Sequence, residues 1–363
     1  MNFELSEDDA MLKALAERFV TDRYEGDARR GHDAEAQGFS SANWSLLGEL
    51  GIIAGLGEHD ALPVSAIAAL FEAFGRGRVA EPLIENVVLA VRLFAATAPE
   101  PLRSDWLSDL LAGRRRIAVA HAEPNARPGC HSLATRAEFS QDQICLTGTK
   151  NCVPAGYGVD AFLVTANTCE DRPVLLFLPA NTRGIHVVDW RMADGSTAIS
   201  LTFDSVSLPR SCQLDGDLVA LDQAQTFANL ARGAEAIGIM DRVLSNTIEH
   251  LRTREQFGIK IGSFQAIQHR MAMQYAVIEQ ARGLLNLSIV SHGTAGFAQS
   301  VAGLRAFLGP ASIELGHEAI QFHGGMGVTD ELAIGHYHKR LLVLSRWPDD
   351  PDAALDRFAG VAA

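Results

Sequence analysis

The chain has 363 residues, of which 47% are hydrophobic and 21% are charged, and this composition excludes a disordered protein. At this length we expect two or three domains, while the net charge of −13 argues against nucleic acid, whose phosphates require a basic surface. The acidic segment Met1–Asp9 argues against a signal or transit peptide, and no uninterrupted apolar run is long enough to span a membrane.

The cysteines and histidines show no pattern of a metal site. The five cysteines are odd in number and contain no C-x-x-C pair, which is typical of reduced thiols in a cytoplasmic protein. His336 and His338 are two residues apart, so on a helix they point in different directions and cannot share a metal. We therefore expect no metal site and a cytoplasmic location.

Up to about residue 113 the pattern of the chain is helical. Ser6 can cap a first helix with Asp9 in its first turn, and apolar residues then recur at helical spacing between Met11 and Val20. Brief polar links separate the following apolar segments, as in a helical bundle. The further helices are expected around Trp44–Leu50, Pro63–Phe74, Ala80–Phe94 and Leu102–Leu111.

From Ile117 to about Leu208 the apolar runs become short and rich in β-formers, with turn residues between them. Because no helical pattern intervenes, this region is predicted to form an antiparallel sandwich or barrel. The four clearest strands are Ile117–Ala120, Gln143–Thr147, Ala161–Thr165 and Val174–Leu178. After them, long amphipathic helices are predicted over Ala220–Thr253, Gln265–Ser291 and Gly296–Phe322, which must pack against one another or across a subunit interface.

The first of two motifs lies where one predicted helix ends and the next begins. It reads Thr253-Arg254-Glu255-Gln256-Phe257-Gly258 and continues, after four residues, with Ser263-Phe264-Gln265-Ala266. Arg254 stands at a helix C-terminus, where a cation is favourable, and could simply pair with Glu249 or Glu255. The aromatic ring and chain reversal beside a forked cation would instead suit the adenine and pyrophosphate of a dinucleotide.

The second motif, Gln321–Glu331, contains three glycines within four residues, at 324, 325 and 327. Glycines permit positive φ and close approach of the backbone to a ligand, although a plain turn between two helices is the alternative. Thr329 is expected to cap the next helix, with Glu331 in the first turn. A Rossmann loop is excluded because no strand precedes the glycines.

In this order and at this separation, the two motifs resemble the C-terminal signatures of the acyl-CoA dehydrogenases. The resemblance implies an α+β fold: an N-terminal helical domain (1–114), a middle antiparallel β domain (115–214) and a C-terminal four-helix bundle (215–363). It also implies FAD as the cofactor, whose ADP half is bound mainly to a neighbouring subunit. The residues that would contact this half are Arg254, Phe257, Gln265, Gln321, Gly324 and Gly325.

The middle region matches the family less well. The loop that reads T-E-P-x-x-G-S-D in the family begins here with Ala122-Glu123-Pro124 but continues differently over 125–130. The G-x-K before the next strand survives as Gly148-Thr149-Lys150, while Cys152-Val153-Pro154 replaces W-I-T. In the family these segments bind and pack the isoalloxazine ring. Pro154 offers neither a hydroxyl nor an N–H, so part of the flavin-ring site is expected to be missing.

The family's catalytic glutamate is absent from both of its usual positions, which correspond to Ala228 and Pro348. Abstraction of the α-proton of a thioester requires a carboxylate in a dry pocket. Glu235 lies on the helix face of Ala228 but about 10 Å along the axis, and we expect it to be buried and paired with an arginine such as Arg232. Asp349, one position from Pro348, is expected to be a solvated turn residue. No catalytic residue is assigned.

This double absence resembles the two-subunit members of the family, similar to enzymes that shorten steroid side chains, in which one subunit lacks the base. The hypothesis is an acyl-CoA dehydrogenase subunit that introduces an α,β double bond into an acyl-CoA thioester, with FAD as hydride acceptor and the glutamate on a partner subunit. The resemblance further implies a homo- or hetero-oligomer (dimer or tetramer), an electron-transfer flavoprotein as partner, and lipid or steroid catabolism. The alternatives are a homomeric dehydrogenase with a displaced base, a non-catalytic FAD- or acyl-CoA-binding protein, and a flavin hydroxylase or nitroalkane oxidase on the same fold.

Overall fold

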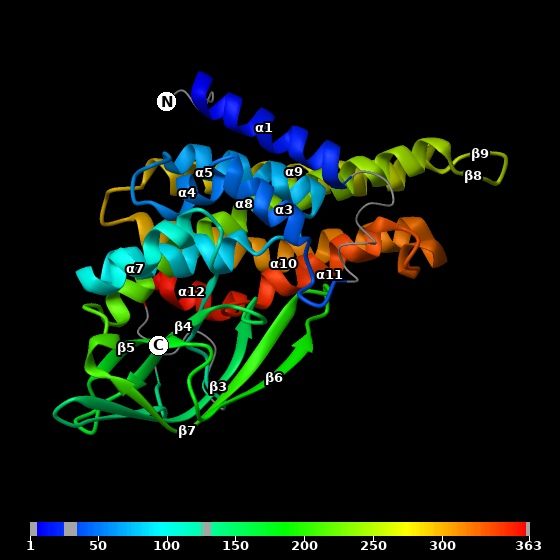
Figure 1. Ribbon diagram of the computed structural model, residues 1–363. Coiled ribbons are helices and arrows are strands. Elements are labelled where there is room, and N and C mark those ends of the chain that lie inside the picture. The colour runs from blue at the N-terminus through cyan, green and yellow to red at the C-terminus, as the bar shows by residue number, and fades with distance from the viewer. Residues whose placement is uncertain (1–5, 25–34, 125, 127–131, 361–363) are drawn as a thin grey trace. The chain divides into compact units, whose positions relative to one another are not determined.

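A computed structural model describes residues 6–24, 35–124, 126 and 132–360 (Figure 1). The chain forms two compact units, each built from separate segments. The first comprises Met1–Asp27, Val64–Val79 and Asn229–Ala363, and the second comprises Ala28–Pro63 and Ala80–Ala228. The domain boundaries expected near residues 114 and 214 stay a prediction. Of the segments before residue 114, some belong to the first unit and others to the second.

The first unit is helical. Its helix α1 (Glu7–Tyr24) begins after Ser6, whose hydroxyl accepts a hydrogen bond from the N–H of Asp9 at 3.1 Å, as predicted. Helix α1 packs against α5 (Val64–Gly77), and α5 crosses α8 (Leu218–Thr253) at close range. A Cβ on Gly238 of α8 would lie 2.0 Å from the carbonyl oxygen of Glu72, so only glycine fits this crossing.

Helix α10 (Phe297–His323) packs against α9 (Gln265–Val290), α11 (Ala333–Arg346) and α12 (Pro351–Ala359). With α8 these helices make up the C-terminal helical bundle, and the bounds of the three long predicted helices are confirmed to within two residues. Short elements lie between them. These are the strands β8 (Glu255–Gln256) and β9 (Ile259–Lys260) and the 3-10 helices η3 (Ile261–Ser263) and η4 (Gly324–Val328).

The second unit is built on a seven-stranded sheet with the order β1-β4-β2-β3-β7-β6, in which β5 also pairs with β4. The four predicted strands are confirmed, and three further strands were not singled out in the sequence. The sheet is mixed: four pairings are antiparallel, as expected, but β4 runs parallel to β1 and β2. The strands are β1 (Ile117–Ala120), β2 (Arg136–Phe139), β3 (Gln143–Pro154), β4 (Ala161–Asn167), β5 (Pro173–Pro179), β6 (Ile185–Arg191) and β7 (Thr197–Pro209).

Apolar side chains from most of these strands form one buried cluster that includes Ile144, Phe162 and Phe203. The helices of the second unit include a rare form, since η1 is a π-helix that continues directly into α6. The Asn86 side chain of η1 donates to the carbonyl oxygens of Ile117 (2.9 Å) and Ala155 (3.4 Å), which joins η1 to the sheet. The helices are α3 (Ser41–Glu49), α4 (Ile52–Gly57), η1 (Leu83–Val91), α6 (Arg92–Thr97), α7 (Glu100–Leu111) and the 3-10 helix η2 (Arg210–Cys212).

Candidate functional site

The first motif folds into a tight hairpin after the end of α8, visible at the β8 and β9 labels in Figure 1. Its two central residues, Phe257 (φ +56°) and Gly258 (φ +78°), both have positive φ, as a two-residue hairpin turn requires. An aromatic residue in this conformation is strained, and the Phe257 side chain is 90% exposed. The fold therefore presents this ring to the outside at a conformational cost, which points to a role in binding.

Arg254 connects α8 to this hairpin. Its N–H donates to the carbonyl oxygen of His250 (2.9 Å), and its own carbonyl accepts from the N–H of Ile261 (2.9 Å). The residue is exposed, and within the described residues its guanidinium forms no ion pair with Glu249 or Glu255. The local pairing considered from the sequence is therefore absent from the structure, and the cation remains accessible from outside the chain.

The remaining predicted contacts lie on the neighbouring helix ends. Gln265 is the first residue of α9, and Gln321 stands in the last turn of α10; both are exposed. Gly324 follows α10 with φ +60° and ψ −143°, a conformation open essentially to glycine alone, and a Cβ on Gly325 would have no neighbour within 4 Å.

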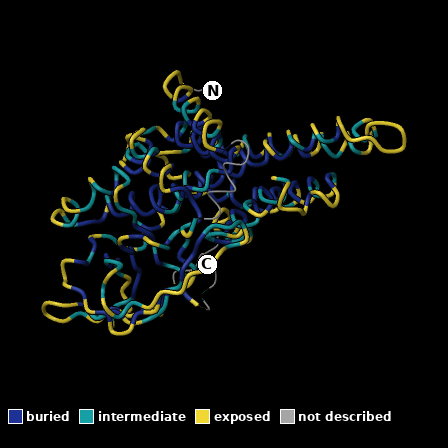
Figure 2. The backbone as a smooth tube through the Cα atoms, turned by 45° about the vertical axis from the view of Figure 1, so that its right-hand side comes forward, coloured by how far each residue is buried: buried dark blue, intermediate teal, exposed yellow. Residues whose placement is uncertain are grey.

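Side-chain contacts bring these helix ends together. The rings of His250 on α8 and His323 on α10 stack with centroids 4.3 Å apart. Arg270 of α9 forms two 2.6 Å hydrogen bonds with Glu318 of α10 and lies over the Phe322 ring. The six predicted cofactor contacts thus gather at one end of the helical unit, where the tube in Figure 2 is mostly exposed.

The expected capping role of Thr329 is wrong. Thr329 closes the 3-10 helix η4, where its N–H and hydroxyl both donate to the carbonyl oxygen of Met326 (3.2 and 3.0 Å). Helix α11 begins only at Ala333, after Leu332, whose side chain makes no capping hydrogen bond. The glycine-rich turn extends further than the sequence indicated because η4 itself takes up the residues up to Val328.

The first acidic residue considered as a substitute for the base, Glu235, is paired with an arginine. Glu235 is 4% exposed, and its two carboxylate oxygens accept hydrogen bonds from Nε and Nη2 of Arg340 at 2.7 and 2.9 Å. A buried carboxylate paired with arginine was expected, but the partner is Arg340 of α11. Arg232 instead donates to the side-chain oxygen of Asn229 (2.8 Å).

The second substitute, Asp349, was expected to be solvated, and this expectation is wrong. Asp349 is 1% exposed and forms ion pairs with Arg357 of α12 and with Arg305 of α10, the latter at 3.3 Å. Arg305 also donates to the carbonyl oxygens of Leu344 (2.5 Å) and Trp347 (2.8 Å). Two arginines from other helices therefore enclose a carboxylate that the local sequence places in a turn.

In the second unit, the surviving family residues Glu123 and Lys150 form a buried ion pair. The two atoms lie 2.6 Å apart, with side chains 3% and 0% exposed, and Lys150 also donates to the Thr165 hydroxyl (3.0 Å). Burial lowers the pKa of Lys150 to about 8, although the Glu123 carboxylate opposes this. Burial alone would raise the pKa of Glu123, but the hydrogen bond and charge of Lys150, with N–H groups of the loop before β2, hold it below its usual value.

The segment that replaces W-I-T departs from regular strand geometry. Cys152 has φ +54°, and the pairing of β3 with β7 shifts register between Lys150 and Val153. Burial, helped by the Glu85 carboxylate, raises the pKa of the Cys152 thiol to about 12, so the thiol stays protonated at neutral pH. The altered loop residues 125 and 127–130 lie outside the described residues.

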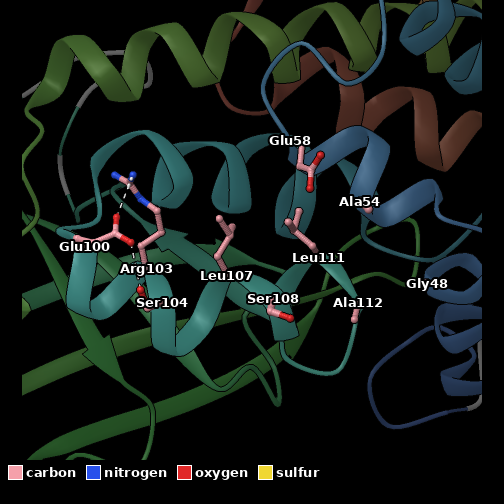
Figure 3. A pocket seen from close by; sticks show the side chains of 10 residues that line it. All are labelled: Gly48, Ala54, Glu58, Glu100, Arg103, Ser104, Leu107, Ser108, Leu111 and Ala112. Atoms are coloured by element: carbon pink, nitrogen blue, oxygen red, sulfur yellow. Dashed lines mark hydrogen bonds and ion pairs between the residues drawn. The ribbon is translucent and has the colours of Figure 1, made fainter.

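A shallow pocket of about 630 Å³ lies elsewhere, among α3, α4 and α7 of the second unit (Figure 3). It is lined by residues such as Ala54, Leu107 and Leu111, with a Glu100–Arg103 ion pair (3.6 Å) at one side. None of the six predicted cofactor contacts lines this pocket.

Two further properties bear on the sequence expectations. Among the described residues, no three His, Cys, Asp or Glu side chains are grouped as a metal ion would require. Over the same part of the chain, every helix is too short or too polar to cross a membrane.

Residues 221–347 match the family model described as acyl-CoA dehydrogenase, C-terminal domain. The relative named acyl-CoA dehydrogenase FadE27, from Mycobacterium tuberculosis, is 27% identical over 359 residues, covering 93% of this chain and 92% of the relative. The structure is similar to one chain of the ChsE4–ChsE5 complex from the same organism (TM-score 0.90, 25% identity, 99% of this chain and 98% of that chain). It is also similar to PigA with FAD and proline (TM-score 0.92, 22% identity, 99% of this chain and 100% of that one). The chain has the acyl-CoA dehydrogenase fold, and its family-model match and full-length relative support the acyl-CoA dehydrogenase family.

Proposed function

We propose that this chain is a subunit of an FAD-dependent acyl-CoA dehydrogenase, and that the glutamate which removes the α-proton of the acyl-CoA comes from a partner subunit. The observation that carries the proposal is the state of the two possible substitutes. Glu235 lies one helical repeat beyond residue 228 and Asp349 lies next to residue 348, and arginines pair with both of them.

A general base needs an oxygen lone pair directed at the proton that it removes. Both oxygens of Glu235 accept N–H groups of Arg340, and Asp349 is enclosed by Arg305 and Arg357. Freeing either carboxylate would break an ion pair of a buried carboxylate, which costs about 2 kcal/mol or more. These residues therefore suit a structural role better than catalysis.

The residues for the ADP half of FAD fit that group. Arg254 supplies a forked cation without an ion pair in the described chain, Phe257 supplies an exposed ring, and Gly325 leaves room for close approach of a ligand. Because these groups face outward, the half-site suits a cofactor shared with a neighbour. When bound, FAD would supply the acceptor for the hydride that leaves the β-carbon.

The ring half fits less well. Pro154 has no N–H to donate, and the buried thiol of Cys152 is a weak donor. What the second unit retains is the Glu123–Lys150 pair, which fixes the start of the altered loop to β3. The proposal therefore assigns the flavin ring, like the base, mainly to the partner.

An oligomer is supported by the outer face of α9. Residues at alternating intervals of three and four are all exposed, and most of them are apolar or small. This spacing has the period at which one helix packs along another. The residues are Ala266, His269, Met273, Ala276, Gln280, Gly283, Leu287 and Val290. We propose a heteromeric dimer or tetramer in the cytoplasm, with an electron-transfer flavoprotein as electron acceptor, acting in lipid or steroid catabolism.

The test is to purify the chain alone and together with an acyl-CoA dehydrogenase-like protein encoded beside it. We expect flavin absorbance and acyl-CoA-dependent dye reduction from the joint preparation, and little of either from the chain alone. Full FAD occupancy and turnover by the chain alone would overturn the proposal in favour of a homomeric enzyme. Flavin binding without bleaching by any acyl-CoA, even in the joint preparation, would identify a non-catalytic binding protein.

A matched pair of variants locates the base. In the joint preparation, Glu235→Gln and Asp349→Asn should each retain turnover when assayed well below their unfolding temperatures. Loss of turnover in one of them, with FAD still bound and the fold intact, would assign the base to this chain.

A further inference from the structure

His250 and His323 lie at the C-terminal ends of α8 and α10, shortly before Arg254 and Gly324 of the candidate ADP site. His250 lies in the last turn of α8, four residues before Arg254, and its carbonyl oxygen accepts the Arg254 N–H. His323 is the last residue of α10 and directly precedes Gly324. The two rings are 27° from parallel with centroids 4.3 Å apart, so the stack joins the two motifs.

Each of the two rings also contacts backbone groups of the helices around it. Nδ1 of His323 lies 2.8 Å from the carbonyl oxygen of Ala319, so this nitrogen carries the proton, and the residue is 8% exposed. Burial lowers the pKa of His250, and the backbone of Phe322, which lies on the other helix, opposes this. Gly327 of η4 comes so close that a Cβ there would lie 3.3 Å from Cβ of His323. The pair is therefore packed from α8, α10 and η4 together.

We expect the stacked histidines to fix the end of α8, and with it the position of Arg254. Its guanidinium has no ion pair in the described chain, and the helix end that carries it would otherwise fray. A ligand that contacts both Arg254 and the turn at Gly324 binds more tightly when their separation is fixed in advance.

We propose that His250 and His323 are positioning residues, which set the separation between Arg254 and the turn at Gly324 for the ADP half of FAD. This inference rests on the proposed function, since it takes that site to bind FAD. It assigns the two histidines no contact with the reacting atoms.

The test uses the assembly that the chain forms, stripped of FAD, with FAD titrated back and followed by quenching of flavin fluorescence. His250→Ala and His323→Ala should each weaken FAD binding by about tenfold, because a small displacement of a preset contact has an effect of this order. His250→Phe should restore most of the affinity, since its ring can stack. His59→Gln, whose side chain is 78% exposed in the second unit, is the control and should bind like the wild type.

The outcomes separate the two proposals. If the wild-type assembly binds no FAD, the proposed function fails first. If it binds FAD and the alanine variants match the His59→Gln control, the positioning role is overturned. Should the alanine variants lose helical content, His250→Gln decides, because it keeps a polar side chain of similar length but lacks a stacking ring. Wild-type affinity in that variant would overturn the inference, and a tenfold loss with unchanged helical content would support it.

Discussion

Replacement of Lys150 by methionine tests the buried Glu123–Lys150 ion pair of the second unit. Over the 2.6 Å between Lys150 and Glu123, an effective dielectric constant of about 20 gives a Coulomb attraction of about 6 kcal/mol. Much of this attraction offsets the desolvation of two charges. The variant leaves the Glu123 carboxylate buried with only loop N–H groups as partners, so we expect a loss of about 3–5 kcal/mol in the free energy of unfolding.

The assay is chemical denaturation at pH 7 for Lys150→Met, Glu123→Gln and the double variant. The double variant should be more stable than Lys150→Met, because it buries no unpaired charge. Arg172→Met is the matched control: it breaks a 2.8 Å ion pair with Glu170 whose side chains are 78% and 69% exposed. We expect that loss to be below about 1 kcal/mol.

The pH dependence gives the sign of the effect. The folded-state pKa of Glu123 lies below its ordinary value of 4.5, so its contribution to stability is present above pH 4.5 and is lost as the pH falls through the folded pKa. The defect of Lys150→Met should therefore shrink in acid, where Glu123 takes up a proton. A loss under about 1 kcal/mol at pH 7, or a double variant no better than Lys150→Met, would refute the reasoning.

Three further predictions concern the helical unit. Gly324→Ala should lower the free energy of unfolding by about 1–3 kcal/mol, because the backbone conformation at this position suits only glycine. Gly325→Ala should keep the wild-type stability but bind FAD more weakly, and equal stability losses of the two variants in denaturation would contradict this. Glu235→Gln should lower the free energy of unfolding by about 2 kcal/mol, because it breaks the ion pair with the partly exposed Arg340, and should leave FAD affinity unchanged. Thermal unfolding checks the stability, and a flavin titration checks the affinity. Burial and then the charge of a neighbouring histidine lower the pKa of His338 below 6.5, so stability should be full above pH 6.5 and fall as the pH drops toward the folded pKa; His338→Gln should flatten that slope in a series of thermal melts.

Local sequence patterns predicted many of the helices and strands. Long apolar stripes predict helices reliably, and α8, α9 and α10 lie within two residues of their predicted bounds. Strand β7 was not singled out because Ser205, with φ +51°, breaks its alternation of buried and exposed residues. Strand β6 is exposed on both faces for most of its length, so it has no apolar face to recognise.

The glycine and aromatic positions of the cofactor motifs were also readable from the sequence. Phe257-Gly258 forms a tight turn and Gly324 takes a conformation that needs glycine, as chain-reversal patterns suggest. The helix start assigned to Thr329 was wrong because a short 3-10 helix continues the turn. A capping residue predicts a helix start only where the residues that follow it adopt helical backbone angles.

The sequence by itself determined the types of element, their order, the two motifs and the lack of an acidic residue at positions 228 and 348. Only the tertiary structure decided what the other carboxylates do. Glu235 meets an arginine 105 residues away, and Asp349 meets one 44 residues away, so no local pattern could indicate either pairing. The physical reason is that burial of a charge is set by helices that pack together from distant parts of the chain, whereas the conformation of a turn or helix is set by neighbours in sequence.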